Sequence, residues 1–106
     1  MRILIAEDDP ILADGLQRTL RHSGHAVDWV NNGAEADAAL GTHEFDLLIL
    51  DISLPRLSGF EVLKRLKSSR KTQFIPVIVL SGSADPADVQ SVIDMGADEF
   101  LGNRIV

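Results

Sequence analysis

Short apolar runs alternate along the chain with longer segments in which apolar residues recur every three or four positions. Two of the runs, "LLIL" and "VIVL", are apolar at every position, which is typical of parallel strands covered on both faces. One helical segment separates each strand from the next, so the pattern indicates successive βαβ units. The predicted strands are Ile3–Ala6, Ala26–Val30, Leu47–Leu50, Val77–Leu80 and Ala97–Leu101.

The segments between the strands carry helix start and stop signals. Asp9 followed by Pro10 offers an N-cap and then proline at the first helical position, and Gly24 can end that helix. Since βαβ crossovers are right-handed, we predict an α/β fold: a flavodoxin-like, doubly wound parallel sheet of five strands in the order 2-1-3-4-5, with no helix after the fifth strand. Further start signals are Asn32 with Glu35, Ser58 with Glu61, and Asp85 with Pro86.

Composition narrows the class of protein. A length of 106 residues suits a single domain, taken as residues 1–106. The net charge of −6 argues against direct binding of nucleic acid, and the absence of cysteine excludes disulfides and thiolate metal sites. No apolar run approaches the roughly 18 residues that a membrane span needs, and the first strand leaves no room for a signal peptide. We therefore expect a cytoplasmic domain that does not bind membranes.

Acidic and hydroxyl side chains stand where three of the strands end. The stretch "ILIAEDDP" runs from the first strand into Glu7 and Asp8, Asp51 ends the third strand, and Ser81 ends the fourth. In the order 2-1-3-4-5 these strands are neighbours, so the side chains should converge at the carboxyl edge of the sheet. Clustered carboxylates repel one another, and Mg²⁺, which prefers oxygen ligands, resolves the repulsion. We predict a Mg²⁺ site there, with Asp9 acting as a helix cap.

Further motifs flank these residues. In "DISLPRLSG", Asp51 precedes Pro55 and Gly59 by four and eight positions, Ser81 is followed by Gly82, and "GADEFL" leads into the fifth strand. Together with the Glu7-Asp8 pair, they resemble the receiver domains of response regulators in two-component signalling, over about residues 2–101. The chemotaxis regulators share this pattern, and the opening "RILIAEDD" is most similar to receivers that precede winged-helix DNA-binding domains.

The resemblance implies a phosphoacceptor, with Asp51 taking a phosphoryl group from a histidine kinase or phosphotransfer protein and the domain then switching conformation to control a partner or effector. Such a domain is regulatory and not an enzyme, beyond catalysing its own phosphorylation and dephosphorylation. Ser81 would donate a hydrogen bond to the phosphoryl group, and Phe100 stands at the family's switch aromatic, with plain core packing as the alternative. The implied Mg²⁺ ligands are Asp8, Asp51, the backbone carbonyl of Ser53 and, through water, Glu7.

The end of the sequence departs from the family pattern. Asn103 stands where the family has a lysine, and Arg104 where it has a proline. Asn103 can donate a hydrogen bond but brings no positive charge to the phosphoryl group. The usual final helix is also absent before Val106, which suggests a truncated, chimeric or engineered receiver. One face of the fourth and fifth strands would then lack cover, so we expect self-association through that region as a two-fold dimer.

Other functions are considered beside this one. A pseudo-receiver, acting as a protein-interaction module without a productive phosphorylation switch, is the main alternative because of Asn103. A haloacid-dehalogenase phosphotransferase needs a second aspartate two positions after the first, where this chain has Ser53. A nucleotide-binding domain is disfavoured because no glycine-rich loop follows the first strand. Trp29 is expected to lie in the core or against a helix and is not assigned to the site.

Overall fold

The computed structural model describes residues 1–81 and 86–102 and shows a five-stranded parallel sheet with helices on both faces. The strands are ordered β2-β1-β3-β4-β5, as predicted. The elements in chain order are β1 (Arg2–Ala6), α1 (Pro10–His22), β2 (Ala26–Val30), α2 (Gly33–Thr42), β3 (Leu47–Asp51), α3 (Gly59–Ser68), β4 (Val77–Ser81), α4 (Pro86–Asp94) and β5 (Glu99–Gly102).

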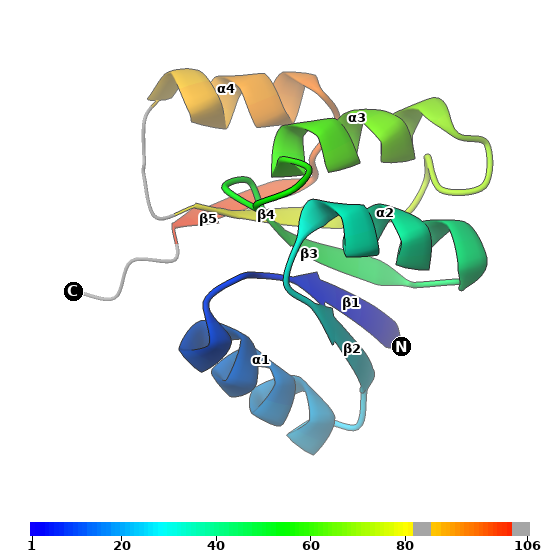
Figure 1. Ribbon diagram of the computed structural model, residues 1–106, viewed down its shortest axis with the longest axis vertical. Helices are drawn as coiled ribbons and strands as arrows, with labels where there is room; N and C mark the ends of the chain where they lie inside the picture. The colour runs from blue at the N-terminus through cyan, green and yellow to red at the C-terminus, as the bar shows by residue number, and fades with distance from the viewer. Residues whose placement is uncertain (82–85, 103–106) are drawn as a thin grey trace.

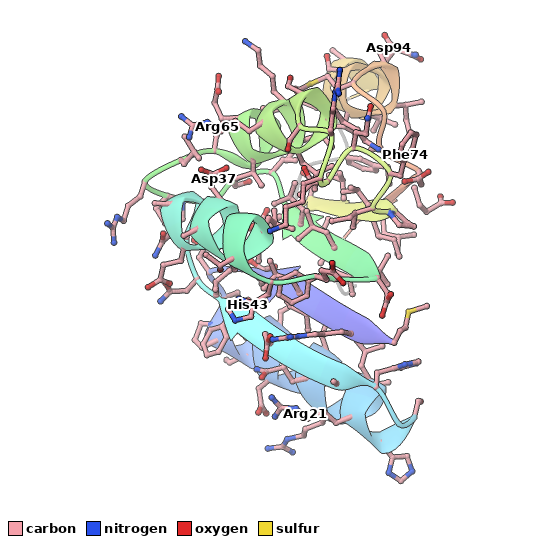
Figure 2. All side chains as sticks on the ribbon, turned by 90° about the vertical axis from the view of Figure 1, so that its right-hand side faces the viewer. Arg21, Asp37, His43, Arg65, Phe74 and Asp94 are labelled. Carbon is pink, nitrogen blue, oxygen red and sulfur yellow. The ribbon has the colours of Figure 1, made fainter. Side chains whose placement is uncertain are left out.

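Two cores form on the two faces of the sheet. Helices α2, α3 and α4 cover one face, and α1 lies on the other (Figure 1). Successive strand residues point to opposite faces, so Leu4 joins the core beneath α2 and α3, while Ile3 and Ile5 pack with α1. Figure 2 shows Asp37 of α2 and Arg65 of α3 side by side, joined by an ion pair of 3.1 Å.

The predicted caps account for where the helices begin and end. Asp9 Oδ1 accepts a hydrogen bond from the backbone N–H of Ile11 at 2.9 Å, and Asn32 and Ser58 cap α2 and α3 in the same way. Gly24 lies just after α1 with a φ of +92°, in the left-handed region that favours glycine. The fourth predicted cap, Asp85, lies outside the described residues.

Strand β5 begins later than the sequence predicted. The prediction started the strand at Ala97, but the Ala97 N–H still closes the last turn of α4 on Val92 O at 3.0 Å. Asp98 then clamps the start of β4: its N–H donates to Val77 O, and its carboxylate accepts from Val77 N at 2.8 Å. Strand β5 therefore starts one residue after Asp98, at Glu99.

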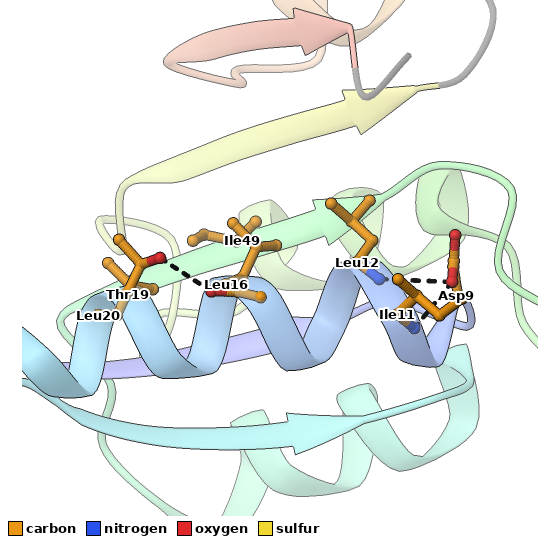
Figure 3. Close-up of a pocket in the computed structure, with 8 residues that line it drawn as sticks. Asp9, Ile11, Leu12, Leu16, Thr19, Leu20 and Ile49 are labelled. Atoms are coloured by element: carbon orange, nitrogen blue, oxygen red, sulfur yellow. Dashed lines mark hydrogen bonds between the residues drawn. The ribbon is translucent and has the colours of Figure 1, made fainter. Parts of the chain in front are cut away.

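An apolar groove of about 590 Å³ runs along α1 over β3 (Figure 3). On this face of the sheet, β4 is less exposed than the sequence predicted, since Leu80 is buried and Ile78 is half-buried. The exposure predicted for β5 is found on Leu101, which is 48% exposed, and Ile11 of α1 is exposed as well. The apolar side chains along the groove are Ile11, Leu12, Leu16, Leu20 and Ile49.

In the part of the chain described, no helix is long and apolar enough to cross a membrane.

Candidate functional site

The carboxyl ends of β1 and β3 bring three acidic side chains together. Glu7 directly follows β1, and Asp51 is the last residue of β3, one step beyond the Ala6–Leu50 register pair. One carboxylate oxygen from each of Glu7, Asp8 and Asp51 lies within 4.8 Å of the others. Asp9 is not part of this cluster because its carboxylate caps α1. The helix cap predicted for Asp9 is therefore confirmed, and the assignment of the other acids to a metal stays a prediction.

The three acids differ in burial. Glu7 is 1% exposed and Asp51 is 4% exposed, while Asp8 is exposed to solvent. Backbone N–H groups hold the two buried carboxylates: Ser53 N donates to Asp51 Oδ1 at 3.0 Å, and Asp9 N donates to Glu7 Oε2 at 3.3 Å. The cluster is thus fixed on its buried side and open to solvent through Asp8.

Burial shapes the protonation of the pair. The pKa of Glu7 is raised from 4.5 to about 8, chiefly by desolvation and then by its hydrogen bond to Asp51 and the charge of Asp51. Desolvation also raises the pKa of Asp51, although the hydrogen bond with Glu7 and that from Ser53 N act in the opposite direction. The pair therefore holds a proton, placed on Glu7, when no cation balances the charge.

Two glycines let the loop after Asp51 pack closely. A Cβ atom on Gly59 would collide with the main chain of Asp51 and Ile52, so glycine is required where α3 begins. A Cβ on Gly33, at the start of α2, would collide with the carbonyl of Leu57. The segment 52–58 is therefore clamped between the first turns of α2 and α3, which fixes the backbone directly after Asp51.

This combination of fold and acidic edge agrees with comparisons to known proteins. Residues 3–104 match the response regulator receiver domain family. The chain belongs to this family. The response regulator protein PmrA of Pseudomonas aeruginosa is 46% identical over 95% of this chain, and the transcriptional regulatory protein QseB of Haemophilus influenzae is 39% identical over the same share. The receiver chain spans 45% of the length of each.

Solved receiver structures share its backbone closely. The phosphorylated cyanobacterial phytochrome response regulator RcpA superposes with a TM-score of 0.92 and 31% identity, over 97% of this chain and 80% of that one. The Mn²⁺-bound form of response regulator Rcp1 gives 0.93 and 27%, over 99% and 82%. The acidic cluster here offers only oxygen donors and a buried pair that needs a balancing charge, so it fits a divalent cation such as Mg²⁺.

The other predicted site residues have different surroundings. Ser53 is exposed next to Asp51, and Ser81 is buried at the end of β4, on the edge that carries the acids. Phe100 is half-buried and packs against the core under α3 and α4, as core packing predicts; its switching role is not tested by this arrangement. Gly82, Asn103 and Arg104 lie outside the described residues.

Sequence reasoning missed one residue beside the acids. Trp29, expected in the core or against a helix, is 39% exposed, and its indole Nε1–H donates to the main-chain oxygen of Glu7 at 2.8 Å. The strand order places β2 next to β1, with Trp29 opposite Ile5. That neighbourhood was predictable, but nothing in the sequence pattern indicated that the ring would reach past the end of the ladder.

Proposed function

We propose that this receiver domain accepts a phosphoryl group on Asp51 from a histidine kinase or phosphotransfer protein, with Mg²⁺ bound beside it. The observation that carries the proposal is the convergence of the Glu7, Asp8 and Asp51 carboxylates within 4.8 Å, on a backbone that holds Asp51 through Ser53 N. The related RcpA structure is of a phosphorylated protein and that of Rcp1 is of an Mn²⁺-bound one, which supports both parts of the proposal.

The residues have distinct roles in this reaction. A carboxylate oxygen of Asp51 attacks the phosphorus as the bond to the donor's leaving atom breaks, and that atom keeps the electron pair of the broken bond. When the metal is bound, Asp8, Asp51 and the carbonyl of Ser53 would hold it directly, and Glu7 would act through water. Bound Mg²⁺ supplies positive charge that neutralises the transferring group. Ser81 stands on the same edge to donate a hydrogen bond to a phosphoryl oxygen.

The proposed role is regulatory. The domain is phosphorylated once, and its conformation then switches through Ser81 and Phe100. Its acidic balance, with a net charge of −6, favours control of a protein partner over direct contact with nucleic acid. The cytoplasm, where response regulators meet their kinases, is the proposed location.

Self-association through the region of β4 and β5 is the proposed second interaction. Its support is that β5 is an edge strand, whose backbone is open to pairing, and that Leu101 on it is exposed. A two-fold dimer would pair this edge with its copy and cover both leucines.

Incubation with Mg²⁺ and acetyl phosphate, followed by intact-mass measurement, tests phosphoryl acceptance. The wild-type protein should gain one acid-labile phosphoryl group, and Asp51→Asn or a metal chelator should prevent this. Asp94→Asn is the matched control, since Asp94 is an exposed acid of α4 that bonds to Gln90. A folded wild-type protein that gains nothing would favour the pseudo-receiver, which binds partners without phosphorylation.

A further inference from the structure

We propose that Trp29 is a positioning residue for the acidic site, because its indole N–H fixes the main chain that carries Glu7 and Asp8. Its importance for the metal rests on the Mg²⁺ site of the proposed function. The contact joins the edge strand β2 to the loop between β1 and α1, which holds two of the three clustered acids.

The bond lies where the β1–β2 ladder ends. The last register pair is Ala6 with Val30. Beyond it, Glu7 N donates to Val30 O at 3.1 Å, and Trp29 Nε1 donates to Glu7 O at 2.8 Å. Both main-chain polar groups of Glu7 are therefore bonded to β2, one to backbone and one to a side chain.

Fixing the Glu7 carbonyl fixes the plane of the peptide that leads into Asp8. A peptide unit is planar, so the orientation of this carbonyl fixes the Asp8 N–Cα bond, and only rotations within Asp8 itself remain to orient its side chain. At the other end of the loop, Asp9 is held by its cap on Ile11 N. Asp8 is exposed between these two anchors, so its placement depends on them.

A fixed main chain at Glu7 and Asp8 should affect the affinity for Mg²⁺. The ion demands near-octahedral geometry, and groups that orient its ligands from outside the first coordination shell affect its affinity. Trp29 is 39% exposed, so the residue is only partly buried, while its indole N–H donates to Glu7 O. Phenylalanine would keep most of the ring contact and lose the donor.

The test compares Trp29→Phe with Phe45→Leu. Phe45 is a buried core residue that follows α2 and precedes β3, away from the carboxyl edge, so its truncation costs stability without touching the acidic loop. Calorimetric titration with Mg²⁺ should show affinity about three- to tenfold weaker for Trp29→Phe and unchanged for Phe45→Leu. Unchanged affinity in a folded Trp29→Phe protein would show that Trp29 is merely structural and overturn the proposal.

A second measurement needs no metal. Amide hydrogen exchange at Glu7 and Asp9, whose N–H groups donate to Val30 O and Glu7 Oε2, should be faster in Trp29→Phe than in wild type, and unchanged in Phe45→Leu. Replacement of Trp29 by 3-benzothienylalanine, which keeps the ring size and puts sulfur in place of the N–H, should have the same effect even if the phenylalanine variant folds poorly. Normal exchange in that protein would refute the positioning role. If the wild-type protein binds no Mg²⁺ but exchange is still faster in the variants, the proposed function is contradicted. The finding that Trp29 fixes the main chain at Glu7 would then still stand.

Discussion

Replacing the buried acid of the site by its neutral isostere should stabilise the domain at neutral pH. Glu7 is 1% exposed, and its pKa is raised from 4.5 to about 8, first by desolvation and then by Asp51. The folded state therefore keeps a proton on Glu7 at pH 7, whereas the unfolded chain releases it. In Glu7→Gln the amide can donate to Asp51 as the protonated acid does, and it can still accept from Asp9 N.

The magnitude follows from proton linkage. Between pH 4.5 and about 8 the folded state binds more protons at Glu7 than the unfolded state, so the free energy of unfolding falls as pH rises through this window. At about 1.4 kcal/mol per pKa unit, the loss in the wild type amounts to about 3 kcal/mol at pH 7. Glu7→Gln removes this loss, so its advantage over the wild type should grow from pH 4.5 to pH 7 by up to that amount.

Urea unfolding of both proteins without metal, at a series of pH values, measures the effect. Saturating Mg²⁺ should flatten the pH dependence of the wild type, because a bound cation favours the ionised acids. Glu44→Gln is the control, since Glu44 is exposed before β3 and away from the site. If Glu7→Gln and wild type lose stability in parallel from pH 5 to pH 8, Glu7 does not hold the proton and our description of the pair is wrong.

Three further predictions concern metal, charge and assembly. Asp8→Asn should weaken Mg²⁺ binding at least about tenfold in a titration, because a direct ligand is lost. Asp9→Asn should change the binding little, since asparagine caps a helix equally well. Equal losses in the two variants would contradict the assignment of Asp8 to the metal and Asp9 to the helix cap. Asn103→Lys should speed phosphorylation by acetyl phosphate, because it restores a charged donor, and an unchanged rate would mean that the charge is supplied elsewhere. Light scattering over a concentration series should show a dimer that Leu101→Ser weakens, and a monomer throughout would exclude self-association.

The sequence predicted most of the fold because the hydrophobic pattern has few solutions. Fully apolar strands such as "LLIL" require cover on both faces, and right-handed crossovers then leave few strand orders, so the edge that carries Asp8 and Asp51 could be predicted. The caps were equally local: Asn32 and Ser58 bond within their own first turns. The start of β5 was wrong because Asp98, four residues along from α4, bonds across to Val77, a contact that no local pattern encodes.

The site was predictable in membership but not in electrostatics. Sequence placed Glu7 beside Asp51, yet a carboxylate at the end of a strand is equally compatible with solvent, and only the tertiary structure shows it 1% exposed with a raised pKa. Trp29 shows the same limit, since its bond to Glu7 O depends on how far the indole reaches past Val30. Such properties arise from packing between elements, which periodicity does not report.

The identity of the phosphorylated residue tests the central claim most directly. After incubation with Mg²⁺ and acetyl phosphate, borohydride reduction converts a phosphoaspartate into homoserine, and peptide mass spectrometry locates it. We predict homoserine at Asp51, the buried acid at the end of β3 that lies within 4.8 Å of the other two acids. Homoserine at another acid, or none in a protein that binds Mg²⁺, would contradict the proposal that this domain is a phosphoacceptor through Asp51.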